Sequence, residues 1–552
     1  MSETRGIRSG GRILVDALCI HGVDRLFCVP GESYLDVLDA LYDTPQIAVV
    51  VAKHEGAAAN MAEADGKLTG RPGICFVTRG PGAAHGSVGV HTAYQDSTPM
   101  ILFVGQIQRN ARGREAFQEV EFRQMFAPLA KWVAEIETAD RIPEYLLRAF
   151  QVATSGRPGP VVLALPEDVL AEQSSALDTR PFRAVQATPA DTELAAVRDE
   201  LERASQPLLI AGGSCWSDEG CAALARFVEA NALPVLASFR RQDLIDNDHA
   251  CYAGHLSLGM PPHLQQRIKA ADLIVALGTR LGDINTMTYS LLRPPRLAAR
   301  LVHVHPEPAE LNRVYQADLA IAASPSAAAI GFAKLAPISG PRWNAWTASA
   351  RHEYEKFIEV PKNAPRRGVD LAVVIRHLAT HLPADAIVAN GAGNFTVWVH
   401  RFFTYRQPRT ELAPTSGSMG YGFPAAIAAS LRYPARTTVC VAGDGDFLMY
   451  PQELATAAQC GARVIVLLVN NGMYGTIRMH QDRRFPGHVS GTDLAGPDFI
   501  ALAKSFGAHA ERVETTEGFA SAFERACAAG RSAVLELVMD RDQITPDRRL
   551  SA

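Results

Sequence analysis

Residues 443–471 read GDGDFLMYPQELATAAQCGARVIVLLVNN and decide the fold of this chain. An apolar, β-branched run leads into the glycines, a helix-compatible segment follows them, and a second apolar run, Arg463–Val469, ends at two asparagines. The order strand, turn, helix, strand predicts one βαβ crossover. Both strands of such a unit end at the same edge of a parallel sheet. We therefore expect Asp444 and Asn471 to be neighbours in space.

The side chains expected at this sheet edge suit a metal ion that holds a diphosphate. Asp444 and Asn471 offer the hard oxygen ligands that Mg²⁺ prefers, and Gly443 and Gly445 let the backbone approach a bulky anion. The helix after the turn adds unpaired N–H groups and the positive end of its dipole. A simpler interpretation makes Asp444 a helix cap and Asn470-Asn471 a turn. The joint spacing favours the binding site.

The spacing of GDG and NN, with 24 residues between them, resembles the thiamine diphosphate signature of the acetolactate synthase and pyruvate decarboxylase superfamily. The resemblance implies that the side chains of Asp444 and Asn471 and the backbone carbonyl of Met473 hold Mg²⁺. It also implies an α/β fold of three doubly wound domains. We expect a pyrimidine-binding domain over 1–175, a Rossmann-like central domain over 190–335 and a diphosphate-binding domain over 366–552.

The composition is that of a globular enzyme with several domains. The 552 residues are too many for one core, and 54 basic residues nearly balance 58 acidic ones, so nucleic acid and anionic membranes are not expected partners. No apolar run approaches the ~20 residues of a membrane span, and the N-terminal residues lack the apolar segment of a secretory signal. Nine cysteines without a CxxC pair indicate neither zinc nor a disulfide framework. We expect a reduced, cytoplasmic protein.

The N-terminal third alternates helices and strands, as a doubly wound domain does. We expect an alanine-rich helix that starts at Glu55, a turn at Gly80-Pro81-Gly82 and a helix over His85–Gln95. The helix dipole alone would explain a carboxylate at a helix start. However, AKHEGAAANMAEADGKLTGRPGICFVTRGPGAAHG resembles the pyrimidine-binding domain of the synthases. There the matching glutamate bonds to N1′ of the aminopyrimidine and promotes loss of the C2 proton, so the resemblance makes Glu55 a catalytic residue.

Other segments carry the same resemblance. AFQE matches the segment that lines the substrate entrance and gives Gln118 a catalytic role, and Met419 matches the residue that bends the cofactor. His85 stands where many synthases have Asn and is a candidate for proton transfer, although it and His91 could equally be structural. The predicted cofactor-binding residues are Gly31, Glu55, Gly393, Asn394, Gly417, Met419, Gly443, Asp444, Gly445, Asp446, Asn471, Met473 and Tyr474.

The central region resembles a Rossmann domain without a GxGxxG motif. It lies between two predicted linkers. The first, 171–189, is rich in Ser, Thr, Pro and charge with little periodicity, and the second, 337–367, contains Trp343 and Trp346. Arg280 matches an arginine of the FAD-binding synthases, but LGDINTM lacks their second arginine. The sequence therefore does not favour FAD.

Four positions depart from the branched-chain synthases. Glu167 replaces a lysine of the substrate channel, His480 replaces a tryptophan that selects the acceptor, and Phe395 replaces a diphosphate-contacting histidine and cannot donate a hydrogen bond. Asp446 stands where a Ser or Thr is usual, and because its carboxylate would repel a diphosphate we expect it to turn away and cap the helix. Arg478, Arg483 and Arg484 are either ligands of an acidic substrate or solvated residues.

The resemblance implies decarboxylation of a 2-keto acid such as pyruvate and carboligation with a second carbonyl, as in acetolactate synthase. The expected cofactors are thiamine diphosphate and Mg²⁺, and the expected partners are small-molecule keto acids or aldehydes. A cofactor held between the first domain of one chain and the third of another implies a homodimer or homotetramer. The alternatives are a 2-hydroxyacyl-CoA lyase or benzaldehyde-lyase-like carboligase, a flavin-dependent pyruvate oxidase and a catalytically weak regulatory protein. Intact Glu55, Asp444 and Asn471 argue against the last.

Overall fold

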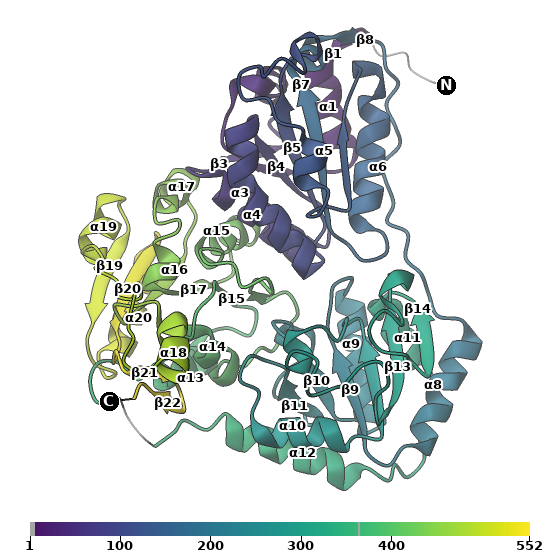
Figure 1. Cartoon of the computed structure of the whole chain (residues 1–552), viewed down its shortest axis with the longest axis vertical. Helices are drawn as coiled ribbons and strands as arrows, with labels where there is room; N and C mark the ends of the chain where they lie inside the picture. Colours follow the sequence, from purple (N-terminus) through teal and green to yellow (C-terminus); the bar gives the residue numbers. More distant parts are fainter. Residues whose placement is uncertain (1–5, 363–364, 552) are drawn as a thin grey trace. The chain divides into compact units, whose positions relative to one another are not determined.

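Three six-stranded sheets organise the chain, and all their strand pairs are parallel (Figure 1). The computed structural model describes residues 6–362 and 365–551. Helices flank each sheet, so the predicted α/β fold with three doubly wound parts is confirmed. Two short antiparallel pairs, β1–β8 and β21–β22, complete the strands of the described residues.

The first sheet has the strand order β3-β2-β4-β5-β7-β6. Its strands are β2 Arg25–Cys28, β3 Ala48–Val51, β4 Gly73–Val77, β5 Met100–Gln106, β6 Trp132–Glu135 and β7 Pro160–Pro166. The helices are α1 Gly10–Ile20, α2 Leu35–Tyr42, α3 Glu55–Thr69, α4 Gly80–Asp96, α5 Phe122–Phe126, α6 Ile142–Thr154 and α7 Glu167–Ala171. The short strands β1 Arg8–Ser9 and β8 Gln173–Ser174 pair with each other, so the first predicted linker begins with a strand.

The start of α4 differs from the prediction. Gly80-Pro81-Gly82 was expected to form a turn but forms the first turn of the helix. Proline is well suited to this place because the first N–H groups of a helix have no intrahelical acceptor. Close contact between small residues then joins α3 and α4, since a Cβ at Gly89 would lie 2.4 Å from the Cβ of Ala59. The contact holds the helices that carry Glu55 and His85 side by side.

The second sheet has the order β11-β10-β9-β12-β13-β14. Its strands are β9 Pro207–Ala211, β10 Val235–Ala237, β11 Tyr252–His255, β12 Leu273–Leu277, β13 Arg300–His305 and β14 Leu319–Ala322. The helices are α8 Asp191–Arg203, α9 Asp218–Ala230, α10 Pro262–Ala270, α11 Pro325–Phe332 and α12 Asn344–Phe357.

Helix α12 corrects the second predicted linker. Trp343 precedes it, is fully buried and donates from Nε1 to the carbonyl of Asn231 at 3.0 Å. Trp346 donates from its own Nε1 to the carbonyl of Pro207 at 3.0 Å. The linker prediction was wrong here because these tryptophans pack against the second sheet, a tertiary contact that local periodicity does not show.

The third sheet has the order β16-β15-β17-β18-β20-β19. Its strands are β15 Ile387–Asn390, β16 Glu411–Leu412, β17 Thr438–Gly443, β18 Ile465–Asn470, β19 His509–Val513 and β20 Ala533–Val538. The helices are α13 Leu371–His381, α14 Phe395–Phe402, α15 Gly422–Arg432, α16 Asp444–Phe447, α17 Glu453–Cys460, α18 Gly475–Arg484, α19 Phe499–Ser505 and α20 Phe519–Ala528. The hairpin strands are β21 Gln543–Thr545 and β22 Arg548–Arg549.

The predicted βαβ crossover is present. Strands β17 and β18 are parallel, with Gly443 opposite Val469. The connecting helix is split into α16 and α17. Pro451 lies in the non-helical segment between them, and proline disfavours a continuous helix because it lacks a backbone N–H.

The chain divides into two compact units. The first unit contains Met1–Val185, Phe423–Pro434 and Leu448–Arg463, and the second contains Gln186–Gly422, Ala435–Phe447 and Val464–Ala552. The second and third sheets belong to the second unit, whereas α17 belongs to the first. The bounds proposed for the three domains stay predictions. Within the described residues, every helix is too short or too polar to cross a membrane.

Candidate active site

A pocket of about 260 Å³ lies in the second unit, where the strands of the third sheet end. Its wall comes from the turns after β15, β17 and β18, together with the loop before α15. All cofactor-binding residues predicted in this region line it: Gly393, Asn394, Gly417, Met419, Gly443, Asp444, Gly445, Asp446, Asn471, Met473 and Tyr474. Segments far apart in the sequence thus meet in one cavity.

Asp444 begins α16 directly after β17, and its side chain is buried. Its Oδ1 accepts the N–H of Gly445 at 3.0 Å, and its Oδ2 accepts the N–H of Gly472 at 2.9 Å. The second bond brings Asp444 to the turn that contains Asn471, as the crossover predicts. Burial raises the pKa of Asp444 to about 6, because desolvation penalises its charged form.

The pocket supplies oxygen ligands but no cationic side chain. Its described lining contains neither Lys nor Arg nor His. Asn471 Oδ1 accepts the N–H of Met473 at 3.3 Å, so this turn gathers an amide oxygen near the Met473 backbone. Together with Asp444, these are the hard oxygen donors that Mg²⁺ prefers. These residues can hold a divalent cation. Its positive charge would balance the negative charges of the buried Asp444 carboxylate and of a diphosphate.

At two positions a neighbouring side chain packs so closely against the backbone that only glycine fits. A Cβ at Gly445 would lie 2.6 Å from Cε1 of Tyr474, and a Cβ at Gly391 would lie 2.2 Å from Oδ1 of Asp446. Neither position has room for a side chain. The sequence predicted Gly445 from the GDG motif, but the tight contact at Gly391 needs the tertiary structure.

Asp446 does not cap a helix, contrary to that part of the expectation, and its position relative to a diphosphate stays a prediction. Its buried Oδ1 accepts the N–H of Ala392 at 3.0 Å and the N–H of Gly420 at 2.9 Å. Burial raises the pKa of Asp446 to about 7. The side chain therefore joins the two loops that follow β15 and precede α15, a contact between distant segments that sequence alone could not reveal.

Phe395 replaces a hydrogen-bond donor of the family with a buried ring. A Cβ at Gly443 would lie 3.1 Å from its Cδ1, so the ring packs on the GDG turn. Next to it, Asn394 Oδ1 accepts from the Thr476 hydroxyl at 2.8 Å. Thr476 lines the pocket and was missed from the sequence, where only its place at the start of the helix after NN could have suggested it.

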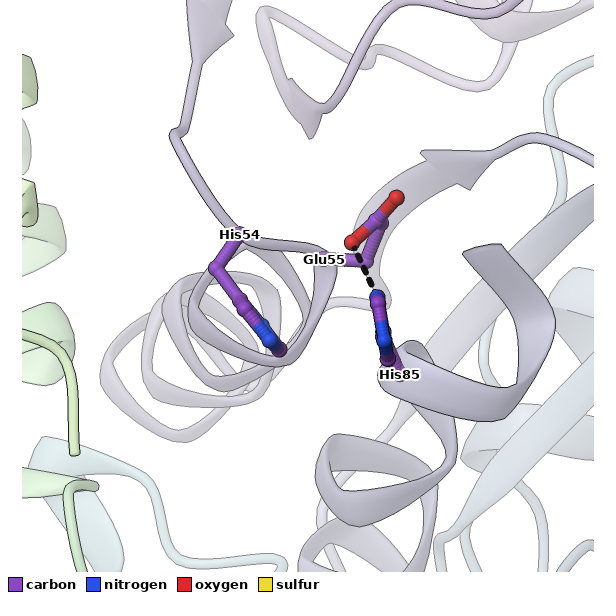
Figure 2. Close-up of side chains that lie close together, drawn as sticks. All are labelled: His54, Glu55 and His85. Carbon is purple, nitrogen blue, oxygen red and sulfur yellow. Dashed lines mark hydrogen bonds and ion pairs between the residues drawn. The ribbon is translucent and has the colours of Figure 1, made fainter. Parts of the chain in front are cut away.

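A second group of predicted residues lies in the first unit (Figure 2). Glu55 is the first residue of α3, and its Oε2 lies 2.9 Å from Nδ1 of His85, which projects from α4. The side chain of Glu55 is 14% exposed and that of His85 is 54% exposed. The arrangement is a carboxylate–imidazole pair with its imidazole toward solvent, which suits proton transfer.

His54 completes the cluster but does not make it a good metal site. Its Nδ1 accepts the N–H of Gly56 at 3.0 Å and caps α3, while burial and the nearby His85 lower its pKa. The imidazoles of His54 and His85 stack, with centroids 4.6 Å apart and planes at 29°. Ligand atoms of His54, Glu55 and His85 lie within 4.8 Å of one another. However, Nδ1 of His54 already accepts the N–H of Gly56 and Nδ1 of His85 already faces Oε2 of Glu55, so hydrogen bonds account for this cluster.

The remaining first-domain predictions lie on loops of the same unit. Gln118 has a φ of 66°, and its carbonyl accepts the N–H of Gly80 at 3.1 Å, which ties the AFQE loop to the start of α4. Gly31 lies against Thr78, because a Cβ there would be 2.6 Å from the Thr78 Cβ. Glu167, where the resemblance led us to expect a lysine, forms an ion pair with Arg79.

The chain matches three family profiles over most of its length. They are described as thiamine pyrophosphate enzyme N-terminal TPP binding domain, central domain and C-terminal TPP binding domain. The matched residues are 8–125, 194–330 and 391–537, respectively.

The relatives agree with these profiles. The chain is 33% identical over 529 residues to the acetolactate synthase large subunit of Parasynechococcus marenigrum, covering 92% of this chain and 84% of the relative. It is 30% identical over 510 residues to the acetolactate synthase isozyme 2 large subunit of Escherichia coli, covering 92% and 91%. A probable acetolactate synthase large subunit of Methanocaldococcus jannaschii is 28% identical over 561 residues, covering 97% and 93%. The chain therefore belongs to the thiamine diphosphate-dependent carboligases of the acetolactate synthase family.

Proposed function

We propose that the enzyme uses Mg²⁺-held thiamine diphosphate to decarboxylate a pyruvate-like 2-keto acid and to join the remaining unit to a second carbonyl. One observation carries the metal assignment. The pocket holds the buried carboxylate of Asp444 beside the Asn471 amide, and no described lining residue is cationic. A diphosphate there needs a counter-charge, and a Mg²⁺ ion on Asp444, Asn471 and the Met473 carbonyl would supply it.

The bound cofactor would supply a carbon nucleophile and an electron sink for decarboxylation. The chain's own part is to position that cofactor and to move protons. Glu55 would hold a proton at the aminopyrimidine, and His85, 2.9 Å away, would exchange it with the more exposed side of the cluster. Gln118, held in its loop through the Gly80 contact, would face the substrate. Gly31 has no side chain, so the pyrimidine ring could pack directly against its backbone.

The experiment is turnover of the purified protein with pyruvate, thiamine diphosphate and Mg²⁺, following CO₂ and acetolactate together. We expect both products, and we expect chelation by EDTA to abolish turnover until Mg²⁺ is restored. Asp444→Asn should weaken metal-dependent cofactor binding strongly, because it removes the one buried anionic ligand. Full activity without a divalent cation would refute the metal assignment.

The proposal also includes the oligomeric state of the protein and its location in the cell. The family resemblance supports a homodimer or homotetramer, which sedimentation at several protein concentrations would test. A cytoplasmic location is supported by the described cysteines, which are all free thiols, most of them buried or half-buried.

A second candidate is a different thiamine diphosphate carboligase or C–C lyase with a larger substrate. Two departures favour it, because Glu167 is paired with Arg79 and His480 lines a cavity of about 1190 Å³. Release of CO₂ from pyruvate without acetolactate, together with ligation of larger aldehydes, would support this candidate.

A further inference from the structure

The larger cavity adjoins the cofactor pocket within the second unit. Its volume is about 1190 Å³, and it shares Gly393, Asn394, Gly417 and Thr476 with the wall of the smaller pocket. A molecule in the larger cavity therefore lies next to residues that also line the smaller one. Cavities of about 300–1,000 Å³ hold drug-sized ligands. This cavity is therefore much larger than a molecule of the size of pyruvate requires.

Five Lys and Arg side chains of the described residues line this cavity: Arg240, Lys356, Arg401, Arg483 and Arg548. Arg240 donates to the carbonyl of Pro414 and Arg401 pairs with Asp547, which leaves three cations on separate elements. Lys356 comes from α12, Arg483 from α18 and Arg548 from β22. No acidic side chain of the described part of the chain forms an ion pair with any of the three. The chain as a whole carries a net charge of −4, so general basicity does not explain this cluster.

The two carboxylates in the wall do not neutralise these cations. Glu353 is engaged by Arg267 at 2.9 Å, and Asp547 is engaged by Arg401 at 2.6 Å. The cavity therefore keeps a positive excess. Cations in the wall of a concave, partly apolar cavity create a positive electrostatic potential inside it, which attracts anions.

Helix α18 directs only some of its basic residues to the cavity. His480 and Arg483, three positions apart, both line it, as residues on one helix face do. Arg478 and Arg484 are not in the wall, and the guanidinium of Arg484 lies over the ring of Phe485 at 5.6 Å. The sequence left open whether the arginines of this segment bind a substrate, and the structure singles out Arg483.

We propose that this cavity selects a substrate with a second anionic group, a carboxylate or a phosphate, remote from the reacting carbonyl. The inference rests on the proposed function, because it names the substrate class of the same site. Lys356, Arg483 and Arg548 attract the distal anion. The apolar side chains of Met260 and Phe357 contact the carbon chain between the two ends.

The test compares substrates that differ in the distal charge. The donors are pyruvate, 2-oxoglutarate, a 2-keto acid that ends in a phosphonate, and the neutral-ended 2-oxohexanoate. Succinic semialdehyde and pentanal serve as charged and neutral acceptors with pyruvate as donor. We expect kcat/KM for a charged-ended member to exceed that of its neutral counterpart by about tenfold at low salt, and the preference to shrink as ionic strength rises. The phosphonate separates recognition of phosphate from recognition of carboxylate.

Matched variants on α18 locate the selectivity. Arg483→Gln should reduce the preference about three- to tenfold, mainly through KM, because it removes an interaction made equally before and during the reaction. Arg483→Lys should keep most of the preference, and Arg484→Gln should keep all of it. Circular dichroism confirms that each variant folds.

The outcomes separate this inference from the proposed function. No cofactor-dependent turnover of any keto acid would refute the proposed function itself. Turnover without a preference for charged ends, or equal effects of Arg483→Gln and Arg484→Gln, would overturn only the substrate class. Flavin released from the purified protein and displaced by the Arg483→Glu substitution would also overturn it, because the cavity would then hold a cofactor.

Discussion

Glu55 is a half-buried carboxylate at a helix start, and its Oε2 lies 2.9 Å from Nδ1 of His85. Glu55→Gln keeps the shape of the side chain and removes its ability to take a proton. Because a positioned acid–base group contributes about 10²–10⁴-fold, we expect kcat to fall at least about a hundredfold. Thiamine diphosphate should still bind, since the diphosphate pocket lies in other segments. The measurements are steady-state turnover, cofactor affinity by fluorescence and exchange of the cofactor C2 proton by NMR.

The matched control for this substitution is Glu144→Gln. Glu144 is exposed on α6 and pairs with Arg141 at 2.8 Å, far from the proposed active residues in sequence, so its loss should leave turnover unchanged. If Glu55→Gln turned over pyruvate as fast as the wild type, with normal C2 exchange, the role given to Glu55 would be wrong.

His21 carries a pH-dependent prediction at the same scale. It is 3% exposed, its Nδ1 accepts the N–H of Phe182 at 3.2 Å, and burial lowers its pKa to about 4. Between pH 6.5 and 4 the unfolded state binds a proton that the folded state does not, so stability falls as pH falls. An unfolded pKa of about 6.5 gives a loss of about 1.4 kcal/mol between pH 7.5 and 5.5.

Chemical denaturation at these two pH values measures that loss. His21→Gln keeps an acceptor for Phe182 but does not titrate, so it should lose about 1.4 kcal/mol less than the wild type over the interval. The comparison isolates His21 from the other buried histidines. Parallel losses in the two proteins would show that His21 does not contribute.

At the scale of elements, Asp446 holds the loop after β15 to the loop before α15. Asp446→Ala removes the acceptor for the N–H groups of Ala392, which is half-buried, and Gly420, which is buried. A buried N–H group left unsatisfied costs about 1–3 kcal/mol, so most of the loss should come from Gly420. We expect weaker cofactor binding and faster hydrogen exchange at both amides. Asp446→Asn keeps an acceptor oxygen and should bind the cofactor nearly as the wild type does. Equal binding by the Ala and Asn variants would show that the loop contact is unimportant.

Elements with strong local patterns could be predicted, and those set by tertiary contacts could not. The GDG-to-NN spacing predicted β17, β18 and the meeting of Asp444 with the Asn471 turn. The helix α12 was mistaken for a linker, because its tryptophans make sense only against the second sheet. The orientation of Asp446 was missed for the same reason, since its partners come from two distant loops.

At the scale of the whole molecule, the first unit depends on contacts between segments far apart in the chain. Arg432, in the segment Phe423–Pro434, donates to Asp65 from Nε at 2.7 Å and from Nη2 at 2.9 Å. Its Nη1 donates to Asp24 at 2.7 Å. The side chain of Asp65 is 7% exposed and that of Asp24 is 60% exposed. The two ion pairs of one arginine therefore differ in the cost of breaking them.

Arg432→Ala should destabilise the first unit by up to about 3–5 kcal/mol, because it removes the guanidinium bonded to the buried Asp65 carboxylate and leaves only the more distant charge of Arg25 near it. Asp24→Ala removes only the exposed partner and should cost less than about 1 kcal/mol. Adding Asp65→Asn to Arg432→Ala should recover part of the loss, since the stranded charge disappears. Thermal unfolding of the apoprotein measures the loss of stability. Hydrogen exchange, read from peptide fragments of each unit, should show that the first unit of Arg432→Ala opens at a lower temperature than the second. Equal costs for Arg432→Ala and Asp24→Ala would mean that water already screens Asp65, and that packing of apolar surface alone joins the separated segments of this unit.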